Sequence, residues 1–230
     1  MKDLELLNLC SQSYSGNVEY QGATFRSYQA GFNTFVFMTI YNGTGIIVFQ
    51  GTLGGINYLK WGWIAKLLNK LGMNSPSWIS DFDVGKRAIP YRWNKRKIIK
   101  AHDGFLNSYT EIRAKAVDIY KNAQEIYITG HSRGGALSTL CAFDLAHKGN
   151  KKIHVTTFGA PRSLGLFGMM AFKRLKSINY KRYEEKSDLV PKLPPFWLNY
   201  FHVGKKEAIG KDMNIEKAHY VATYEADLPK

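Results

Sequence analysis

The sequence predicts an α/β fold built on a mixed, mostly parallel sheet with helices on both faces. Two observations lead to this prediction. Segments rich in Val, Ile, Tyr and Phe alternate along the chain with segments whose apolar residues recur at helical spacing. The 230 residues also contain no internal repeat, and this length fits a single domain. We therefore expect one domain over residues 1–230.

The expected strands are short and rich in β-branched and aromatic residues. They are Thr34–Tyr41, Gly45–Gln50, Glu125–Thr129, Ile153–Phe158 and Ile178–Tyr183. The segment Asn42-Gly43-Thr44 between the first two has the composition of a hairpin turn, so these strands should pair antiparallel. The later strands are separated by helical segments, which favours parallel pairing. The sheet should therefore be antiparallel at its start and parallel afterwards.

The expected helices lie between the later strands. They cover Leu106–Lys121, Gly134–Lys148 and Leu166–Leu175. In the first two, apolar residues recur every three or four positions, as they do on the buried face of an amphipathic helix. Strands that alternate with such helices are typical of a sheet covered on both faces.

The composition restricts the classes of partner and site. The chain has 32 Lys and Arg against 18 Asp and Glu, a net charge of +14 that favours an anionic partner such as lipid headgroups. No nucleic-acid-binding motif accompanies this charge, so no nucleic acid partner is expected. The only two cysteines, Cys10 and Cys141, exclude a disulfide framework, and no Cys/His cluster predicts a metal site.

The N-terminus does not predict export by the Sec route. Asp3 and Glu5 interrupt its short Leu run, which a signal peptide would keep apolar. No stretch of the chain reaches the roughly 18 apolar residues that cross a bilayer. We expect a cytoplasmic protein or one delivered by a non-Sec route, for example packaged in a virion, with only peripheral membrane contact.

The segment Gly130-His131-Ser132-Arg133-Gly134 matches the GxSxG pattern of a nucleophile elbow. A strand-like segment precedes it and a helix-like segment follows it, and this is the context that the motif requires. The two glycines leave room where side chains would collide, and free N–H groups at the helix N-terminus favour an anion beside the serine. The pattern predicts Ser132 as the nucleophile of an ester hydrolase.

The sequence resembles the class 3 lipase family of α/β-hydrolases from about Phe35 to Tyr220. Five motifs carry the resemblance, in this order: IVFQGT at 47–52, HDGFL at 102–106, GHSRGGA at 130–136, FGAPR at 158–162 and SDLVPKLPP at 187–195. The resemblance implies an α/β-hydrolase fold, an acyl-enzyme route and no cofactor. Two residues depart from the family pattern: Gln50 stands where Arg is usual, and Arg133 stands where Leu is usual.

A serine hydroxyl needs a base to take its proton, and the base needs an acid to hold its tautomer. In α/β-hydrolases the order along the chain is Ser, then Asp or Glu, then His. Asp188 follows an expected strand at the carboxyl edge of the sheet, and the resemblance places the acid there, whereas Asp144 should be a solvated helix residue. Only His202 and His219 follow Asp188; the resemblance favours His219, with His202 as the alternative.

An attacked ester places negative charge on its carbonyl oxygen, and preorganised donors stabilise that charge. The elbow offers the backbone N–H of Arg133, which does not depend on the side chain. The resemblance assigns a second donor to Thr52.

Residues 53–80 form an insert that predicts a helical lid. Leu59, Trp63 and Leu67 recur at helical spacing, and Trp61 flanks them, whereas the lysines of the segment fall largely off this face. A basic amphipathic helix of this kind suits a membrane surface, and a core-facing helix is the alternative.

Together these features predict a serine-dependent hydrolase of lipid carboxylic esters, lipase-like or phospholipase A1-like, that acts at anionic membrane surfaces. Two alternatives stay open: an esterase of small soluble or cell-wall esters, and a non-catalytic module that binds lipid surfaces.

Overall fold

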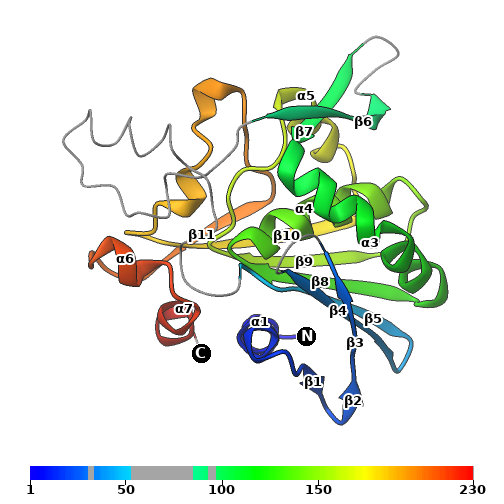
Figure 1. The fold of residues 1–230 in the computed structure, drawn as a ribbon, viewed down its shortest axis with the longest axis horizontal. Helices are drawn as coiled ribbons and strands as arrows, with labels where there is room; N and C mark the ends of the chain where they lie inside the picture. The colour runs from blue at the N-terminus through cyan, green and yellow to red at the C-terminus, as the bar shows by residue number, and fades with distance from the viewer. Residues whose placement is uncertain (31–33, 53–84, 93–96, 230) are drawn as a thin grey trace.

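The computed structural model of this chain describes residues 1–30, 34–52, 85–92 and 97–229 (Figure 1). Within these residues, seven strands form one sheet in the order β11-β10-β9-β8-β5-β4-β3. Their bounds are β3 (Arg26–Gln29), β4 (Phe35–Tyr41), β5 (Thr44–Phe49), β8 (Glu125–His131), β9 (Ile153–Phe158), β10 (Ile178–Glu185) and β11 (Lys205–Ile209). Strands β3, β4 and β5 pair antiparallel, and β5, β8, β9, β10 and β11 pair parallel in that order. The predicted mixed sheet is confirmed.

The hairpin between β4 and β5 turns on two residues, Asn42 and Gly43. Their φ angles are 48° and 79°, and two successive positive φ angles are the geometry that matches the right-handed twist of paired strands. Thr44, which the sequence placed in the turn, is instead the first residue of β5 and pairs with Tyr41.

Helices cover both faces of the sheet. On one face lie α3 (Asp103–Asn122), α4 (Arg133–Ala146) and α5 (Leu166–Phe172), which correspond to the three predicted helices. On the other face lie α1 (Asp3–Ser15) and α7 (Val221–Asp227). Figure 1 shows α1 and α7 on the opposite side of the sheet from α3 and α4.

Strand β5, an inner strand of the sheet, is buried on both of its faces. Ile47 and Phe49 join the apolar cluster under α3 and α4, whereas Ile46 and Val48 join the cluster under α1 and α7. This follows from the pleat of a strand, which points successive side chains to opposite faces. It also explains why the strand is a continuous apolar run without alternation.

Several elements were not predicted, and most of them are short. They are α1, α7, β1 (Glu19–Tyr20), β2 (Ala23–Thr24), β3, β6 (Lys86–Arg92), β7 (Ile98–His102), β11, α6 (Ile215–Ala218) and the 3-10 turns η2 (Val190–Lys192) and η3 (Phe196–Leu198). Helix α1 is the longest of them, and it buries Leu6, Leu7, Leu9 and Cys10 against the sheet. Strands β6 and β7 form a separate antiparallel pair.

The expectation that Asp144 is solvated was wrong. Its side chain is buried and accepts hydrogen bonds from Tyr109 at 2.8 Å and from two nitrogens of Arg113 at 2.9 and 3.0 Å, as well as from Tyr91. Burial would raise the pKa of Asp144, but the hydrogen bonds from Arg113, Tyr91 and Tyr109 outweigh it and lower the pKa. A buried carboxylate is tolerated here because all of its charge is paired.

The predicted lid, with Leu59, Trp61, Trp63 and Leu67, lies outside the described residues, so its helical form stays a prediction. The single domain over residues 1–230 likewise stays a prediction. Among the residues that the structure describes, no helix combines the length and the apolar character needed to cross a bilayer.

Two glycines allow α4 to start directly against the sheet. A Cβ atom on Gly134 would lie 2.2 Å from the carbonyl oxygen of Phe49, and one on Gly130 would lie 2.4 Å from the carbonyl group of Gly134. Both contacts are with backbone atoms, which cannot move aside as a flexible side chain can. The helix that follows Ser132 can therefore approach β5 and β8 this closely only with glycine at both positions.

We expect Gly134→Ala to lower the free energy of unfolding by about 1–3 kcal/mol, because the added methyl group forces α4 away from β5. Urea denaturation measures the change. Gly104→Ala in α3 is the matched control, since its Cβ would meet only the His102 ring at 3.5 Å, an ordinary contact. Alanine is also favoured in a helix, so the control should be neutral or stabilising. Equal losses in the two variants would contradict the close approach as the cause.

Candidate active site

Ser132 is the single residue between β8 and α4. It is 8% exposed, and its φ of 56° is positive, which is costly for a residue with a Cβ atom. Its backbone N–H donates to the carbonyl oxygen of Phe158 at 2.9 Å, so β9 holds the turn from the side. The strained turn places the serine at the carboxyl edge of the parallel strands, where sites form in open α/β sheets.

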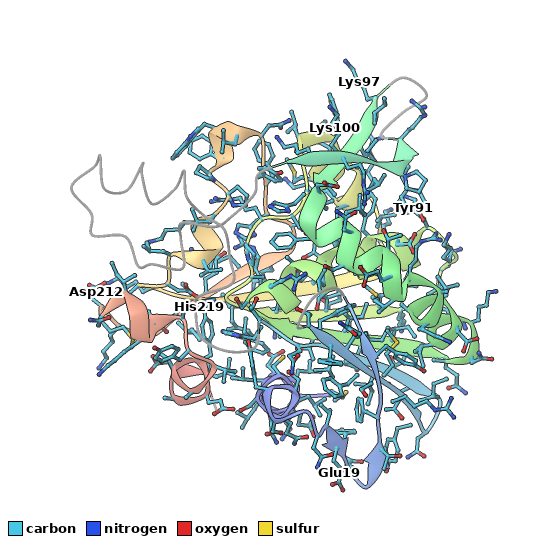
Figure 2. The ribbon with its side chains drawn as sticks, in the orientation of Figure 1. Glu19, Tyr91, Lys97, Lys100, Asp212 and His219 are labelled. Atoms are coloured by element: carbon cyan, nitrogen blue, oxygen red, sulfur yellow. The ribbon has the colours of Figure 1, made fainter. Side chains whose placement is uncertain are left out.

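The structure brings Ser132, His219 and Asp188 together, although 87 residues separate the first pair and 31 the second. The Ser132 hydroxyl lies 2.8 Å from Nε2 of His219, and Nδ1 of His219 lies 2.8 Å from Oδ2 of Asp188. A carboxylate only accepts, so Nδ1 carries the proton, and Nε2 is then free to accept from the hydroxyl. His219 lies between α6 and α7, beside the end of the sheet (Figure 2).

The carboxylate of Asp188 is fixed by two further donors. The backbone N–H of Val190 donates to Oδ1 at 2.9 Å, and the hydroxyl of Tyr224 donates to Oδ2 at 2.7 Å. Asp188 is 1% exposed, so these bonds replace the water that a charged carboxylate would otherwise require. Tyr224 lies in α7 and was not predicted, because nothing in its local sequence distinguishes it from the other tyrosines of the chain.

His131 supports His219 from behind, and this role was not predicted either. The carbonyl oxygen of His219 can only accept, so Nε2 of His131, 2.9 Å away, is the donor. Nδ1 of His131 then accepts from the hydroxyl of Tyr14, 2.7 Å away in α1. Burial lowers the pKa of His131 well below its usual value, and the nearby His219 lowers it further, which agrees with a neutral ring.

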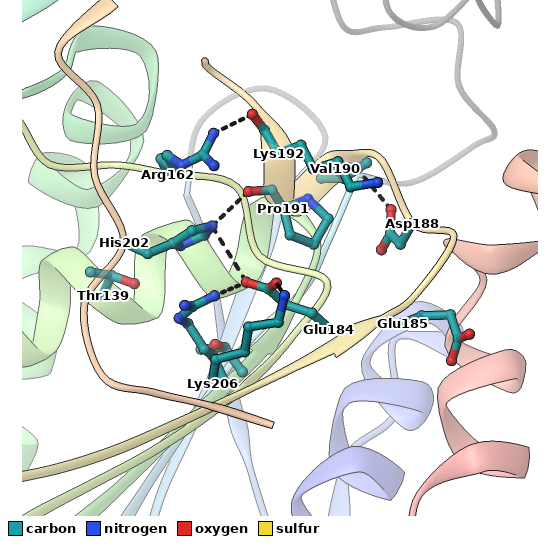
Figure 3. Close-up of polar contacts among 12 residues, drawn as sticks. Thr139, Arg162, Glu184, Glu185, Asp188, Val190, Pro191, Lys192, His202 and Lys206 are labelled. Carbon is teal, nitrogen blue, oxygen red and sulfur yellow. Dashed lines mark hydrogen bonds and ion pairs between the residues drawn. The ribbon is translucent and has the colours of Figure 1, made fainter. Parts of the chain in front are cut away.

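His202, the alternative base, lies elsewhere. Its Nε2 is 2.6 Å from the carbonyl oxygen of Pro191 and 3.6 Å from the carboxylate of Glu184 (Figure 3). Burial lowers the pKa of His202 to about 3, and the charge of Arg182 contributes, so the ring is neutral and donates to Pro191. The structure thus brings His219, and not His202, to Ser132.

The loop after Asp188 is held by contacts from two other segments of the chain. His202 donates to Pro191, and the guanidinium of Arg162 donates to the carbonyl oxygen of Lys192 (Figure 3). The same guanidinium donates to the carbonyl oxygen of Pro194 at 2.8 Å. These bonds tie the loop to segments that follow β9 and precede β11. These hydrogen bonds therefore restrict the movement of the backbone that follows Asp188.

Arg133 is the first residue of α4, and Thr52 lies three residues after the end of β5. Because α4 begins against the end of β5, the backbone of Arg133 and the residues that follow β5 are close together. The hydroxyl oxygen of Thr52 is buried and has no hydrogen-bond partner within the described residues. An unpaired buried donor is costly unless a ligand uses it, so Thr52 is suited to receive an oxyanion.

The two departures from the family pattern have structural roles. The side chain of Gln50 accepts from the backbone N–H of Phe35 at 3.1 Å and donates to the carbonyl oxygen of Ser13, so it links β4 to α1. The guanidinium of Arg133 donates to the hydroxyls of Thr34 and Ser108. Burial lowers the pKa of Arg133 from its usual value. Its side chain is thus directed into the fold.

Comparison with known proteins decides the family. Residues 71–197, more than half of the chain, match the family model described as lipase (class 3). The chain belongs to the class 3 lipase family. Curated relatives include a lipase of Rhizomucor miehei, 31% identical over 140 residues that cover 56% of this chain and 37% of that protein. A phospholipase A1-II 5 of Oryza sativa subsp. indica is 31% identical over 114 residues, 46% of this chain and 24% of that protein.

This class 3 lipase chain has the α/β-hydrolase fold, as the resemblance implied. The native Rhizomucor miehei lipase propeptide complex superposes with a TM-score of 0.65 at 23% identity, over 90% of this chain and 67% of that one. The triacylglyceride lipase of the same organism superposes with a TM-score of 0.63 at 21% identity, over 90% and 78%. The sequence alignments, in contrast, cover well under half of the curated relatives.

Glu185, the last residue of β10, is a second buried acid beside this site. It is 2% exposed, and its backbone N–H donates to the hydroxyl of Tyr224 at 3.1 Å. A Cβ atom on Gly210 would lie 1.9 Å from its carboxyl oxygens, so a side chain at position 210 would displace the Glu185 carboxyl group. Burial, together with the charge of Asp227, raises the pKa of Glu185 to about 7.

We expect Tyr14→Phe to slow the reaction of Ser132 with a fluorophosphonate probe about three- to tenfold, the cost of one buried hydrogen bond. Without the Tyr14 donor, His131 can shift its proton to Nδ1 and release the carbonyl oxygen of His219. Labelling rates measure the effect. Tyr20→Phe is the control, because its hydroxyl contacts Glu5 and Gln21 far from the site. A wild-type labelling rate in Tyr14→Phe would refute the role of this contact.

The raised pKa of Glu185 predicts how stability depends on pH. The folded protein keeps the proton that the unfolded chain releases near pH 4.5, so stability falls as the pH rises from about 4.5 to 7. Gln at position 185 does not titrate. The free energy of unfolding of Glu185→Gln, measured relative to wild type, should therefore rise by about 2 kcal/mol from pH 5 to pH 8. Urea denaturation at the two pH values measures this gain. Glu19→Gln on exposed β1 is the control, and an equal gain there would contradict the assignment.

Proposed function

We propose that this protein is a serine-dependent hydrolase of lipid carboxylic esters, of the lipase or phospholipase A1 type. The observation that carries the proposal is the pair of 2.8 Å contacts that place the His219 imidazole between the Ser132 hydroxyl and the Asp188 carboxylate. Only this order of groups allows one ring to take a proton on one nitrogen while a carboxylate stabilises the resulting charge on the other.

The reaction proceeds in two halves. In the first, the Ser132 oxygen attacks the ester carbonyl carbon while Nε2 of His219 takes the hydroxyl proton. The tetrahedral intermediate expels the alcohol, which receives this proton, and leaves an acyl group on Ser132. In the second half, water attacks the acyl group, with His219 again taking and returning a proton, and the fatty acid leaves.

The neighbouring groups supply the electrostatics of both halves. Asp188 orients His219 and stabilises the imidazolium form. The backbone N–H of Arg133, at the N-terminus of α4, and the hydroxyl of Thr52, which has no partner among the described residues, are proposed to receive the oxyanion. Every proton and bond in this route is handled by groups of the chain, and it requires no metal or organic cofactor.

The substrate class rests on the relatives and on the charge of the chain. Relatives named as lipase, as secreted mono- and diacylglycerol lipase and as phospholipase A1 support acylglycerol or phospholipid esters. The net charge of +14 favours anionic membrane surfaces as the place of action. The Trp61 and Trp63 insert is proposed to contribute there as a lid.

We expect Ser132→Ala and His219→Ala each to lose at least about a thousandfold in turnover of p-nitrophenyl esters and of anionic phospholipid vesicles. Because His202 donates to Pro191 and lies away from the serine, His202→Gln should lose less than about tenfold. Initial rates are measured on a panel of substrates: the p-nitrophenyl esters, the anionic phospholipid vesicles and a triglyceride emulsion.

The panel also separates the alternatives. Turnover of small esters without any activity on emulsions or vesicles would favour an esterase of soluble esters. A Ser132 hydroxyl that does not react with a fluorophosphonate, in a protein that still binds vesicles, would favour a non-catalytic module. Equal turnover by wild type and Ser132→Ala would refute the assigned nucleophile.

A further inference from the structure

Four large apolar side chains are exposed at one end of the molecule. Phe196 and Trp197 in η3 are 60% and 63% exposed, and their rings contact each other edge to face at a centroid distance of 5.3 Å. Ile98 in β7 is 46% exposed and Leu166 at the start of α5 is 37% exposed. Exposed aromatic residues in adjacent positions are unusual on the surface of a protein without a partner.

Direct contacts hold these segments together. The backbone N–H of Gly165 donates to the carbonyl oxygen of Lys100 at 2.9 Å, which joins α5 to β7. The backbone N–H of Leu166 donates to the side chain of Asn199 at 3.2 Å, which joins α5 to η3. The ammonium group of Lys86 in β6 donates to the carbonyl oxygen of Leu198. Figure 1 shows α5 beside β6 and β7 at this end, and Figure 2 labels Lys97 and Lys100 on it.

The same end is basic. The described segments that form it, residues 86–92, 97–102, 162–177 and 189–206, contain no Asp or Glu, and each of the three stretches 86–102, 162–177 and 189–206 contains Lys or Arg. Lys97, Lys100 and Lys192 are exposed. The acid that follows β7, Asp103, is paired with Arg87 at 3.2 Å. We call this surface, with Ile98, Leu166, Phe196, Trp197 and the three exposed lysines, the aromatic–basic end.

This end is joined to the candidate active site through one short loop. The loop runs from Asp188 through η2 to η3, and Arg162 fixes it by donating to the carbonyl oxygens of Lys192 and Pro194. A surface that docks through Phe196 and Trp197 is therefore held at a defined position relative to Asp188.

We propose that the aromatic–basic end docks on the surface of an anionic phospholipid membrane. Aromatic side chains settle at the boundary between headgroups and acyl chains, and lysines around them bind anionic headgroups. A second copy of this chain fits less well, because two such ends would bring cations against cations. The inference rests on the proposed function, since it identifies a described surface that presents the site to its lipid substrate.

The test measures membrane binding without hydrolysis. Ser132→Ala protein is sedimented with vesicles of phosphatidylcholine that contain about 30% phosphatidylglycerol, and with vesicles of phosphatidylcholine alone. We expect Phe196→Ser/Trp197→Ser to weaken binding to the anionic vesicles at least about tenfold. Lys97→Gln/Lys100→Gln should weaken it about tenfold and reduce its dependence on salt.

Matched controls remove the same chemistry from other surfaces. Leu4→Ser/Ile40→Ser removes two exposed apolar side chains from α1 and β4, and Lys121→Gln/Lys152→Gln removes two exposed cations near the start of β8 and β9. Both control variants should bind the anionic vesicles within about twofold of the parent.

Three results would overturn the proposal: no binding of the parent to anionic vesicles, unchanged binding of Phe196→Ser/Trp197→Ser, or equal losses in the control variants. Single-stranded DNA that binds this end more tightly than vesicles do would also overturn it, because basic and aromatic groups can stack on bases. Fluorophosphonate labelling of protein with intact Ser132 separates the two proposals. A reactive serine in a protein that does not bind vesicles would refute the docking surface and leave the hydrolase proposal standing.

Discussion

The position of one imidazole ring governs this site, and the chain restrains that ring on three sides. Asp188 holds Nδ1 of His219, the Ser132 hydroxyl faces Nε2, and Nε2–H of His131 holds the carbonyl oxygen of the same residue. His219 lies in a short connection between α6 and α7, where local secondary structure alone cannot fix a side chain. Its orientation therefore depends on the sheet, through His131, and on the helix α7, through Tyr224 and Asp188.

The buried polar groups around the ring form one connected set. Tyr14, His131, Tyr224 and Asp188 are all buried or nearly so, and each makes at least one hydrogen bond to another member or to His219. Such a network stabilises a single arrangement of side chains only when every polar group in it has its hydrogen-bond partners. Thr52 is different, because its buried hydroxyl has no partner among the described residues, and its role as an oxyanion donor is our proposal.

The strands and helices that could be predicted from the sequence are those in which apolar residues recur at a regular spacing. The central strands and the helices α3, α4 and α5 were predicted within a few residues, because burial on one or both faces leaves a repeating apolar pattern. Ser132 was predicted from the elbow motif, and Asp188 and His219 from chain order together with the family resemblance; the structure brings the three side chains together.

The rest depends on contacts between segments far apart in the chain. Neither α1 nor β11 carries a motif, and Tyr14 becomes relevant only because α1 packs beneath His131. Asp144 shows the same limit in a core helix: its burial is decided by Arg113, Tyr91 and Tyr109, which lie more than 30 residues away. Side-chain partners of this kind leave no local pattern in the sequence.

The placement of α1 also has a consequence for the order of folding. This helix is synthesised before the surface that it covers: Cys10 contacts Thr129 at 3.2 Å, and Asp3 accepts from Tyr183 at 2.8 Å. Contacts so distant in sequence carry a large loop-closure cost and form late. Leu6, Leu7 and Leu9 therefore gain their buried contacts only after the strands that they cover have been synthesised.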